Sequence, residues 1–362
     1  MRPTSSKAKI LVYDLGGGTF DVSLVEITPD ELRVIGTAGD HQLGGKDWDD
    51  RILLYLATEF EEEFGEELVG EEFNELMVLA EKTKISLSAK QSITVTVRNN
   101  QHRGKYEITR TQFEEQTKDL MERTQMLVNQ VLEDTQLTWA EIEGVVLVGT
   151  RMPMVLEYVE RMSGKPAMTG VNPDEAVALG AAIQAAMDTE SQKGQQMMFL
   201  GGRKRNIDAI SRSLGMIAQN EDGSKYINSI IIQKNEPIPC QQTRPYRLPI
   251  RRSGDNKLEV FMTQGETTDP MSCAYLGKYV FTDIPQIQAR AAIVDLTYSY
   301  NLNGVVEVAA VERSTQQPLT LTIEPLPHDI PHRFALSPAN ETAREHLNLY
   351  MAFDLSGSME GK

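Results

Sequence analysis

The sequence contains few cysteines, no long apolar run and no excess of positive charge. The 362 residues include two cysteines, Cys240 and Cys273, whose wide separation argues against a compact metal-binding knuckle. We interpret them as free thiols of a reducing, cytoplasmic compartment. No apolar stretch is long enough to cross a bilayer, and the N-terminus lacks the apolar core of a signal peptide, so we expect no membrane partner.

Charge and motif content exclude further classes. The net charge is −16, with 52 acidic against 36 basic residues, which disfavours a nucleic-acid partner. The phosphate-loop pattern G-x-x-x-x-G-K-[ST] is missing, which excludes a P-loop enzyme. Hydrophobic residues make up 40 % and charged residues 24 % of the chain, as is typical of globular proteins. The length allows two or three domains.

The most informative stretch is residues 14–21, which reads Asp-Leu-Gly-Gly-Gly-Thr-Phe-Asp. Apolar residues 10–13 precede it and alternating residues 22–27 follow, so we predict a strand, a glycine turn and a second strand. Glycines do not hold a ligand away, and their amides can converge on a phosphate. Asp14, at the end of the first strand, could hold Mg²⁺ or orient a water. Three glycines alone favour an ordinary hairpin, but the flanking Asp14, Thr19 and Asp21 favour a ligand site.

Residues 14–21 resemble the second phosphate-binding hairpin of the actin-like ATPases, in the form used by the DnaK-type seventy-kilodalton heat-shock chaperones. Three further segments carry the same resemblance. Residues 39–47 resemble the family's Gly-Asp-x-x-Leu-Gly-Gly loop, and residues 172–177 match its Asn-Pro-Asp-Glu-Ala-Val. Residues 148–153 resemble its Val-Gly-Gly-Ser-Thr-Arg-[Ile/Met]-Pro signature but are two residues shorter.

Residues 81–88 are similar to the family's Glu-x-x-Lys-Arg-x-Leu-Ser stretch, which contacts adenosine. The family's arginine stacks on adenine, whereas Ile85 stands here and supplies no cation–π interaction. Considered without the resemblance, Glu81 and Lys84 suit a surface pair spaced i, i+3 on a helix.

The resemblance implies ATP or ADP with Mg²⁺ as the ligand. It implies that Asp14 serves the Mg²⁺ or attacking-water network, that Thr19 lies beside the γ-phosphate and that Asp21 helps to hold a monovalent cation. The other cofactor-binding positions that it implies are Gly16, Gly17, Gly18, Gly44 and Gly45 near phosphate, Glu81, Lys84, Ser88 and Asp174 around the adenosine, and Gly149 and Arg151.

Local patterns also predict helices. We place Asp47 as the cap of one helix. In a second helix, Phe73 and Met77 belong to the apolar spacing. Thr111-x-x-Glu114 has the form of a capping box and predicts the start of a long helix there.

From residue 213 to about 323 the pattern changes to short alternating strands with turns, which predicts an all-β sandwich. Asn303-Gly304 between two such runs predicts a type I′ hairpin. This half resembles the chaperone family's peptide-binding β domain, which implies unfolded or extended polypeptides as partners. The family's groove positions fall on Met216, Ile227, Tyr246, Leu258 and Val260. Alternating apolar residues of this kind equally suit the core of a sandwich, and that alternative stays open.

The C-terminal residues depart from the chaperone pattern. Residues 325–338 are rich in proline, where the family has a helical lid. Residues 347–358 resemble the first strand and Asp-x-Ser-x-Ser motif of a von Willebrand factor A domain. Because the downstream ligands of that motif do not follow, we expect no functional metal site there.

We therefore predict an α/β actin-like ATPase lobe followed by an all-β sandwich, in a multi-domain chain that looks truncated at both ends. The predicted parts are the second ATPase lobe over residues 1–187, a linker over 188–212, the peptide-binding domain over 213–325, and the join with the von Willebrand A strand over 326–362.

The expected parent function is that of an ATP-dependent chaperone, with co-chaperones as further partners. Because the family's first lobe is missing, we expect little ATPase activity, and whether the chain is an enzyme stays open. The alternative is a non-catalytic peptide-binding or scaffold module. It is favoured by Ile85, by the shortened segment 148–153 and by a weakly apolar linker. An inert gene fragment is also compatible with the sequence.

Overall fold

The computed structural model describes residues 7–168, 172–173, 175–193, 205–250, 256–285, 291–335 and 353–354. It divides into two compact units, Met1–Ile207 and Asp208–Lys362, each with its own hydrophobic core. The division falls inside the range predicted as a linker.

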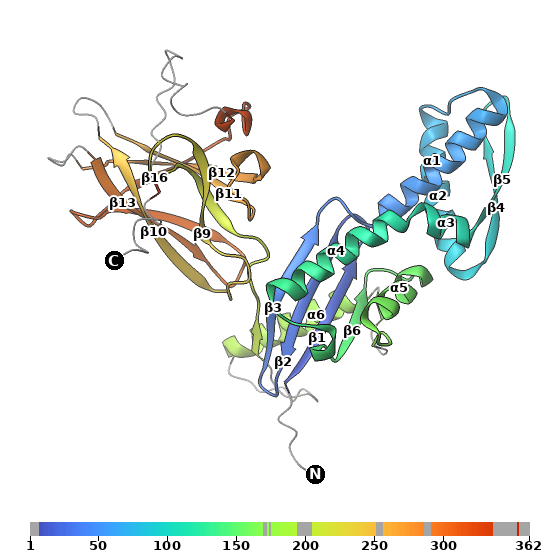
Figure 1. Ribbon diagram of the computed structural model, residues 1–362, viewed down its shortest axis with the longest axis horizontal. Helices are drawn as coiled ribbons and strands as arrows, with labels where there is room; N and C mark the ends of the chain where they lie inside the picture. Colours follow the sequence, from blue (N-terminus) through green and yellow to red (C-terminus); the bar gives the residue numbers. More distant parts are fainter. Residues whose placement is uncertain are drawn as a thin grey trace, which may run out of the picture. The chain divides into compact units, whose positions relative to one another are not determined.

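The first unit is built on a five-stranded sheet in the order β6-β1-β2-β3-β7 (Figure 1). Its strands are β1 (Ala8–Leu15), β2 (Phe20–Ile27), β3 (Glu31–Asp40), β6 (Gly144–Val148) and β7 (Arg205–Ile207). β1, β2 and β3 run antiparallel in succession, as the sequence predicts for the first two, while β6 pairs parallel with β1. The carboxyl ends of β1 and β6 therefore meet at one edge, beside the glycine turn.

A long helix, α4 (Lys118–Asp134), lies along one face of this sheet (Figure 1). The helix comes close at Gly36 of β3, where an added Cβ would lie 2.4 Å from the Thr135 side chain. The other helices of this part are α5 (Pro153–Ser163) and α6 (Ala176–Lys193). α6 and β7 both extend into the range predicted as a linker, so that range is structured at both of its described ends.

Two helices and a hairpin extend from the sheet (Figure 1): α1 (Gly45–Phe64), α2 (Glu71–Ala89), β4 (Ser92–Arg98) and β5 (Arg103–Thr109). Trp48 and Phe60 of α1 are fully buried. The prediction of which side of α2 is buried was partly wrong, because Phe73 and Met77 are 37 % and 39 % exposed while Thr83 is buried. The buried side of α2 packs against α1. Periodicity alone did not show which residues would lie on that side.

Two helix starts differ from prediction. Thr109 caps α3 (Arg110–Gln116), since its amide donates to Gln112 Oε1 at 3.0 Å and its Oγ1 accepts from the Gln112 amide at 3.2 Å. The predicted box at Thr111 was therefore two residues late. Asp47 lies at the third position of α1 rather than at its cap, and its carboxylate accepts from the Gly44 amide at 2.7 Å. It still satisfies an amide of the helix start.

The described part of the second unit consists of strands and short 3₁₀ turns (Figure 1). The main strands are β8 (Leu214–Gln219), β9 (Tyr226–Ile232), β10 (Cys240–Pro249), β11 (Leu258–Gln264), β12 (Ala274–Thr282), β13 (Ala291–Tyr300), β14 (Val306–Glu312), β15 (Gln317–Pro318) and β16 (Thr320–Glu324). Together with β17 (Phe353–Asp354) they join one sheet in the order β15-β14-β13-β10-β17-β8-β11-β12-β16, with β9 paired to β8.

The turn between β13 and β14 is not the predicted type I′ turn. That turn needs a positive φ at both central residues, and Asn303 does not have one. Instead the Gly304 amide donates to Asn301 O at 3.1 Å, and Gly304 itself has φ +76°. The hairpin is in place, but with a longer loop of residues 301–305.

The C-terminal described residues pack against the strands. Phe334, in the 3₁₀ turn His332–Phe334, lies among Tyr226, Phe261 and Tyr275 at ring-centroid distances of 5.2, 5.2 and 6.1 Å. β17 (Phe353–Asp354) pairs with β10 and β8. The residues of the predicted von Willebrand A motif beyond Asp354 lie outside the described part of the chain.

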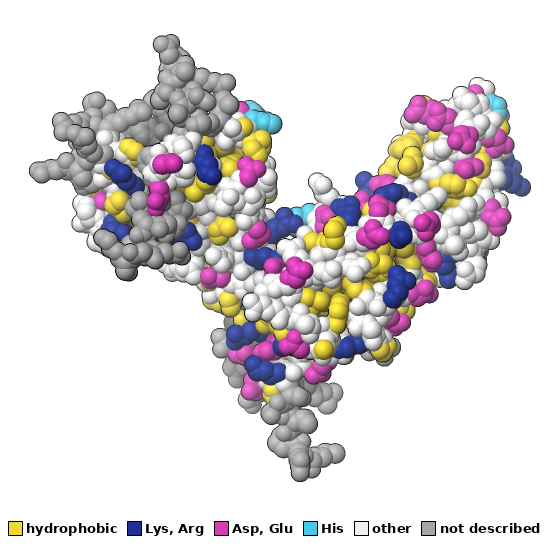
Figure 2. Space-filling view, in the orientation of Figure 1, with side chains coloured by type: hydrophobic (Ala, Val, Ile, Leu, Met, Phe, Trp, Pro, Cys, Tyr) yellow, Lys and Arg dark blue, Asp and Glu magenta, His cyan; other side chains and the backbone are white. Residues whose placement is uncertain are grey.

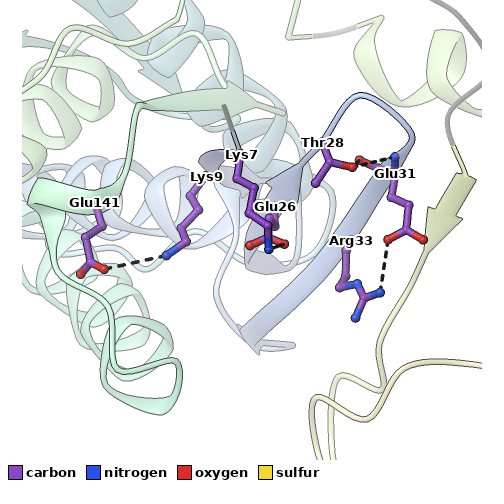
Figure 3. A network of polar contacts seen from close by, with 7 residues as sticks. All are labelled: Lys7, Lys9, Glu26, Thr28, Glu31, Arg33 and Glu141. Carbon is purple, nitrogen blue, oxygen red and sulfur yellow. Dashed lines mark hydrogen bonds and ion pairs between the residues drawn. The ribbon is translucent and has the colours of Figure 1, made fainter. Parts of the chain in front are cut away.

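Charged side chains of both signs are interspersed over the visible face of the first unit (Figure 2). At the end of the sheet away from the glycine turn, Lys7 pairs with Glu26 at 3.2 Å and Lys9 with Glu141 at 3.8 Å (Figure 3). Each pair has one exposed partner, and such pairs at a surface contribute little stability. None of the described helices is long and apolar enough to cross a membrane.

Candidate functional site

The glycine turn joins β1 to β2 as a tight, exposed loop. The Gly16 amide donates to Thr19 O at 2.9 Å, which closes the turn. Gly17 and Gly18 are exposed, and an added Cβ on either would meet no atom within 4 Å. Among the described residues their amides have no hydrogen-bond partner, so both can donate to an anion placed over the turn.

A second glycine segment, Gly44 and Gly45 at the start of α1, packs against this turn. The Gly45 and Lys46 amides, at the start of α1, donate to Gly16 O and Gly17 O, each at 2.8 Å. Gly44 packs directly on the turn, because an added Cβ would lie 2.4 Å from Gly18 Cα. The first two amides of α1 are thus hydrogen-bonded to carbonyls of the hairpin. Gly44 and Gly45 hold the hairpin, and the amides left for an anion are those of the turn itself.

Two carboxylates flank the turn. Asp14 stands opposite Asp21 in the β1–β2 ladder and beside Val148 of β6. Burial and the neighbouring Asp21 charge raise the pKa of Asp14. Both carboxylates supply the hard oxygen ligands that suit Mg²⁺. The described residues contain no cluster of three His, Cys, Asp or Glu side chains that could hold a metal.

Gly149 brings the end of β6 against these carboxylates. Its φ is +79°, and an added Cβ would lie 2.7 Å from Asp14 Oδ1, so a side chain is excluded here by both conformation and space. Its amide donates to Pro173 O at 3.3 Å, and Arg151 Nη2 donates to Asn172 Oδ1 at 3.1 Å. Segments 148–153 and 172–173 are therefore adjacent. Asp174 lies outside the described residues.

Three of the predicted adenosine residues, Glu81, Lys84 and Ser88, lie on α2, and their surroundings differ. Lys84 donates from Nζ to Gly45 O at 2.7 Å and pairs with Asp49 Oδ2 at 2.9 Å, instead of forming a surface pair with Glu81. Glu81 is exposed, and Ile85 is 61 % exposed. Ser88 borders a small pocket, lined by Lys84, Leu87, Ser88, Arg110, Phe113, Glu114, Met152, Pro153 and Met154.

Sequence reasoning missed the contributions of Asp49 and Arg110. Asp49 holds the ammonium group of Lys84, and Arg110 lines the pocket while donating to Leu87 O at 2.9 Å. No spacing rule connects position 49 with position 84, because they lie on different helices. A carboxylate one turn into a helix that follows a glycine loop is the only signal that could have pointed to Asp49.

The predicted groove residues lie mostly inside the second unit. Met216, Tyr246, Leu258 and Val260 are fully buried in its core, and Tyr246 Oη lies 2.8 Å from Ser229 Oγ. Ile227 is half-buried. This burial agrees with the core alternative for the four buried side chains, and their part in a groove stays a prediction.

The sequence is similar to known proteins. The profile of the Hsp70 protein family matches residues 1–331. The chain is 34 % identical over 328 residues to the chaperone protein DnaK of Thermosipho africanus, covering 87 % of this chain and 52 % of the relative. It is 35 % identical over 315 residues to DnaK of Thermotoga maritima, covering 83 % and 50 %.

The chain therefore belongs to the Hsp70 family, a class of chaperones. It spans about half the length of the curated DnaK relatives that it matches. The matched residues include the glycine turn, the α1 loop, α2 and the strands of the second unit.

Proposed function

We propose that the first unit is the second lobe of an actin-like ATPase domain and binds ATP or ADP with Mg²⁺. The observation that carries this proposal is the exposed turn whose Gly17 and Gly18 amides have no hydrogen-bond partner among the described residues, flanked by Asp14 and Asp21. Backbone amides and hard oxygen ligands at one edge suit a magnesium-bound polyphosphate. When bound, the ion would neutralise charge on the phosphates, and Asp14 would orient a water or an ion-bound water.

We further propose that the second unit is a peptide-binding β sandwich for unfolded or extended polypeptides. Family membership and the strand content of the unit support it. The interval 188–212 would couple nucleotide binding to peptide binding, and co-chaperones would act on the protein in a cytoplasmic setting. The von Willebrand A assignment of residues 347–358 stays a proposal from the sequence motif alone.

The chain by itself should turn over ATP very slowly. Phosphoryl transfer depends on positioning and electrostatics around the phosphates, and the described site supplies groups from one side. Calorimetric titration with Mg·ADP and Mg·ATP tests binding, and we expect saturation at micromolar concentration. Absence of heat from folded protein would refute nucleotide binding. ATP turnover well above that of an Asp14→Asn variant would refute the low-activity proposal.

The alternative, a non-catalytic peptide-binding or scaffold module, is favoured by one observation. Ile85 stands exposed where the family's arginine would stack on adenine, so the base would lose that interaction. Fluorescence anisotropy with a labelled extended apolar peptide separates the two functions. Peptide affinity that changes on adding Mg·ATP supports the chaperone function, and affinity that does not change supports the module.

A further inference from the structure

Lys84 connects α2 to the first turn of α1, next to the glycine turn. It extends from α2, its side chain is 14 % exposed, and its ammonium group contacts Gly45 O at 2.7 Å and Asp49 Oδ2 at 2.9 Å on α1. Gly45 in turn donates its amide to Gly16 O at 2.8 Å. One residue thus separates Lys84 from the hairpin that carries the proposed phosphate-binding amides.

Gly45 lies closely packed between the Lys84 side chain and the Gly16 carbonyl. An added Cβ on Gly45 would lie 3.2 Å from Lys84 Nζ and 3.5 Å from Gly16 O. The next amide, that of Lys46, donates to Gly17 O at 2.8 Å. Any shift of the first turn of α1 therefore moves the carbonyls of Gly16 and Gly17, and with them the peptide planes that carry the Gly17 and Gly18 amides.

The electrostatics indicate that this contact sets geometry rather than adding stability. A cation near a helix N-terminus opposes the helix dipole, and Asp49 offsets that cost. Asp49 is itself partly desolvated, and its Oδ1 is buried with no hydrogen-bond partner in the part of the chain that the structure describes. Burial raises the pKa of Asp49, although Lys84 opposes the shift. A desolvated ion pair contributes little net stability, and breaking it by removing one partner is costly.

We propose that Lys84 is a positioning residue, which holds Gly45 and the first turn of α1 against the glycine hairpin and so aims the Gly17 and Gly18 amides at a diphosphate group. This inference rests on the proposed nucleotide binding. It differs from the role that the family resemblance implies, in which Lys84 contacts the adenosine. Lys84 acts on the phosphate end through Gly45, and the ribose need not be present.

The first test compares three probes, Mg·ADP, Mg·3′-deoxyADP and magnesium pyrophosphate, by calorimetry on the full chain. Lys84→Met removes the contact to Gly45. Lys82→Met removes the same charge from an exposed side chain of the same helix and is the matched control. Loss of one charged hydrogen bond predicts that Lys84→Met weakens all three probes by about tenfold, with Lys82→Met unchanged. A loss seen with ADP but not with 3′-deoxyADP would show a direct ribose contact and overturn the proposal.

The second test needs no nucleotide. Hydrogen exchange of the peptide spanning Gly45 and Lys46 should be roughly tenfold faster in Lys84→Met and in Asp49→Asn than in the wild type or Lys82→Met. Unchanged exchange in Lys84→Met would overturn the proposal, because a direct contact of Lys84 with phosphate would weaken binding without loosening the free protein. If the chain binds none of the probes, nucleotide binding itself fails, and the exchange result alone decides the role of Lys84.

Discussion

The packing of Gly44 on the glycine turn makes a sharp prediction for Gly44→Ala. The backbone at Gly44 is extended, with φ −162° and ψ 179°, so alanine has no conformational difficulty there. The difficulty is space, because the new Cβ would lie 2.4 Å from Gly18 Cα and from its carbonyl carbon, and 2.5 Å from its nitrogen. Main-chain atoms cannot rotate away as a side chain can, so the α1 loop and the hairpin must separate.

The expected cost can be estimated. Overpacking in a well-packed site costs about 1–3 kcal/mol of unfolding free energy. A loss of about 2 kcal/mol would lower the midpoint of thermal unfolding by roughly 4–8 °C for a unit of this size. The separation would also lengthen the hydrogen bonds from Gly45 and Lys46 to the hairpin, so proposed phosphate binding should weaken together with stability.

The chain offers a convenient probe for this measurement. It contains two tryptophans, Trp48 and Trp139, and both lie in the first unit. Tryptophan emission during urea or thermal unfolding therefore reports on the first unit alone.

Gly17→Ala is the matched control for stability, since an added Cβ there meets nothing within 4 Å and the backbone is outside the left-handed region. We expect Gly17→Ala to be neutral or slightly stabilising. Equal stability of Gly44→Ala and Gly17→Ala would refute the packing argument.

Three further predictions follow from other parts of the structure. Asp14→Asn should raise the stability of the first unit at neutral pH, since the raised pKa of Asp14 means that its charged form is disfavoured in the folded state. This gain in stability should shrink as the pH falls from above the pKa of Asp14 in the folded state toward its lower pKa in the unfolded state. A gain in stability that grows on acidification would contradict the prediction. Phe334→Ala should destabilise the second unit by about 3–5 kcal/mol, measured by near-ultraviolet circular dichroism. The exposed neighbour His332→Ala should change stability by less than about 0.5 kcal/mol, and equal effects would show that the aromatic cluster is not part of the core. Thr109→Ala should lower the free energy of unfolding by about 1 kcal/mol, because it removes the cap of α3. Thr111→Ala should lower it little. A larger loss for Thr111→Ala in urea unfolding would show that Thr111 is the cap.

Local sequence predicted the parts of the fold that depend on neighbours in the chain. The strand–glycine–strand pattern of residues 8–27 was confirmed as β1 and β2, because alternation and glycine content are local properties. The cap at Thr109 was missed because Thr111-x-x-Glu114 satisfies the same pattern. The choice between them depends on where β5 ends.

The candidate site was predicted in part. The turn, Asp14 and the segment around Gly44 lie together at one edge, as the family resemblance implies for the phosphate end. The partners of Lys84 were not predicted, because they depend on how α2 packs against the first turn of α1. The burial of Tyr246 and Val260 was also open in the sequence, since alternation is the same for a core and for a groove.

The sequence by itself determined family membership, the division into a mixed α/β part and a strand-rich part, and the position of the glycine turn between two strands. These follow from short motifs and from hydrophobic periodicity, which need no long-range contact to be seen. Only the tertiary structure decided which amides remain available for a ligand, because the first amides of α1 are taken by the carbonyls of Gly16 and Gly17. It also decided that Lys84 faces Gly45 and Asp49, since the direction of a long side chain depends on the charges and space that packing places around it.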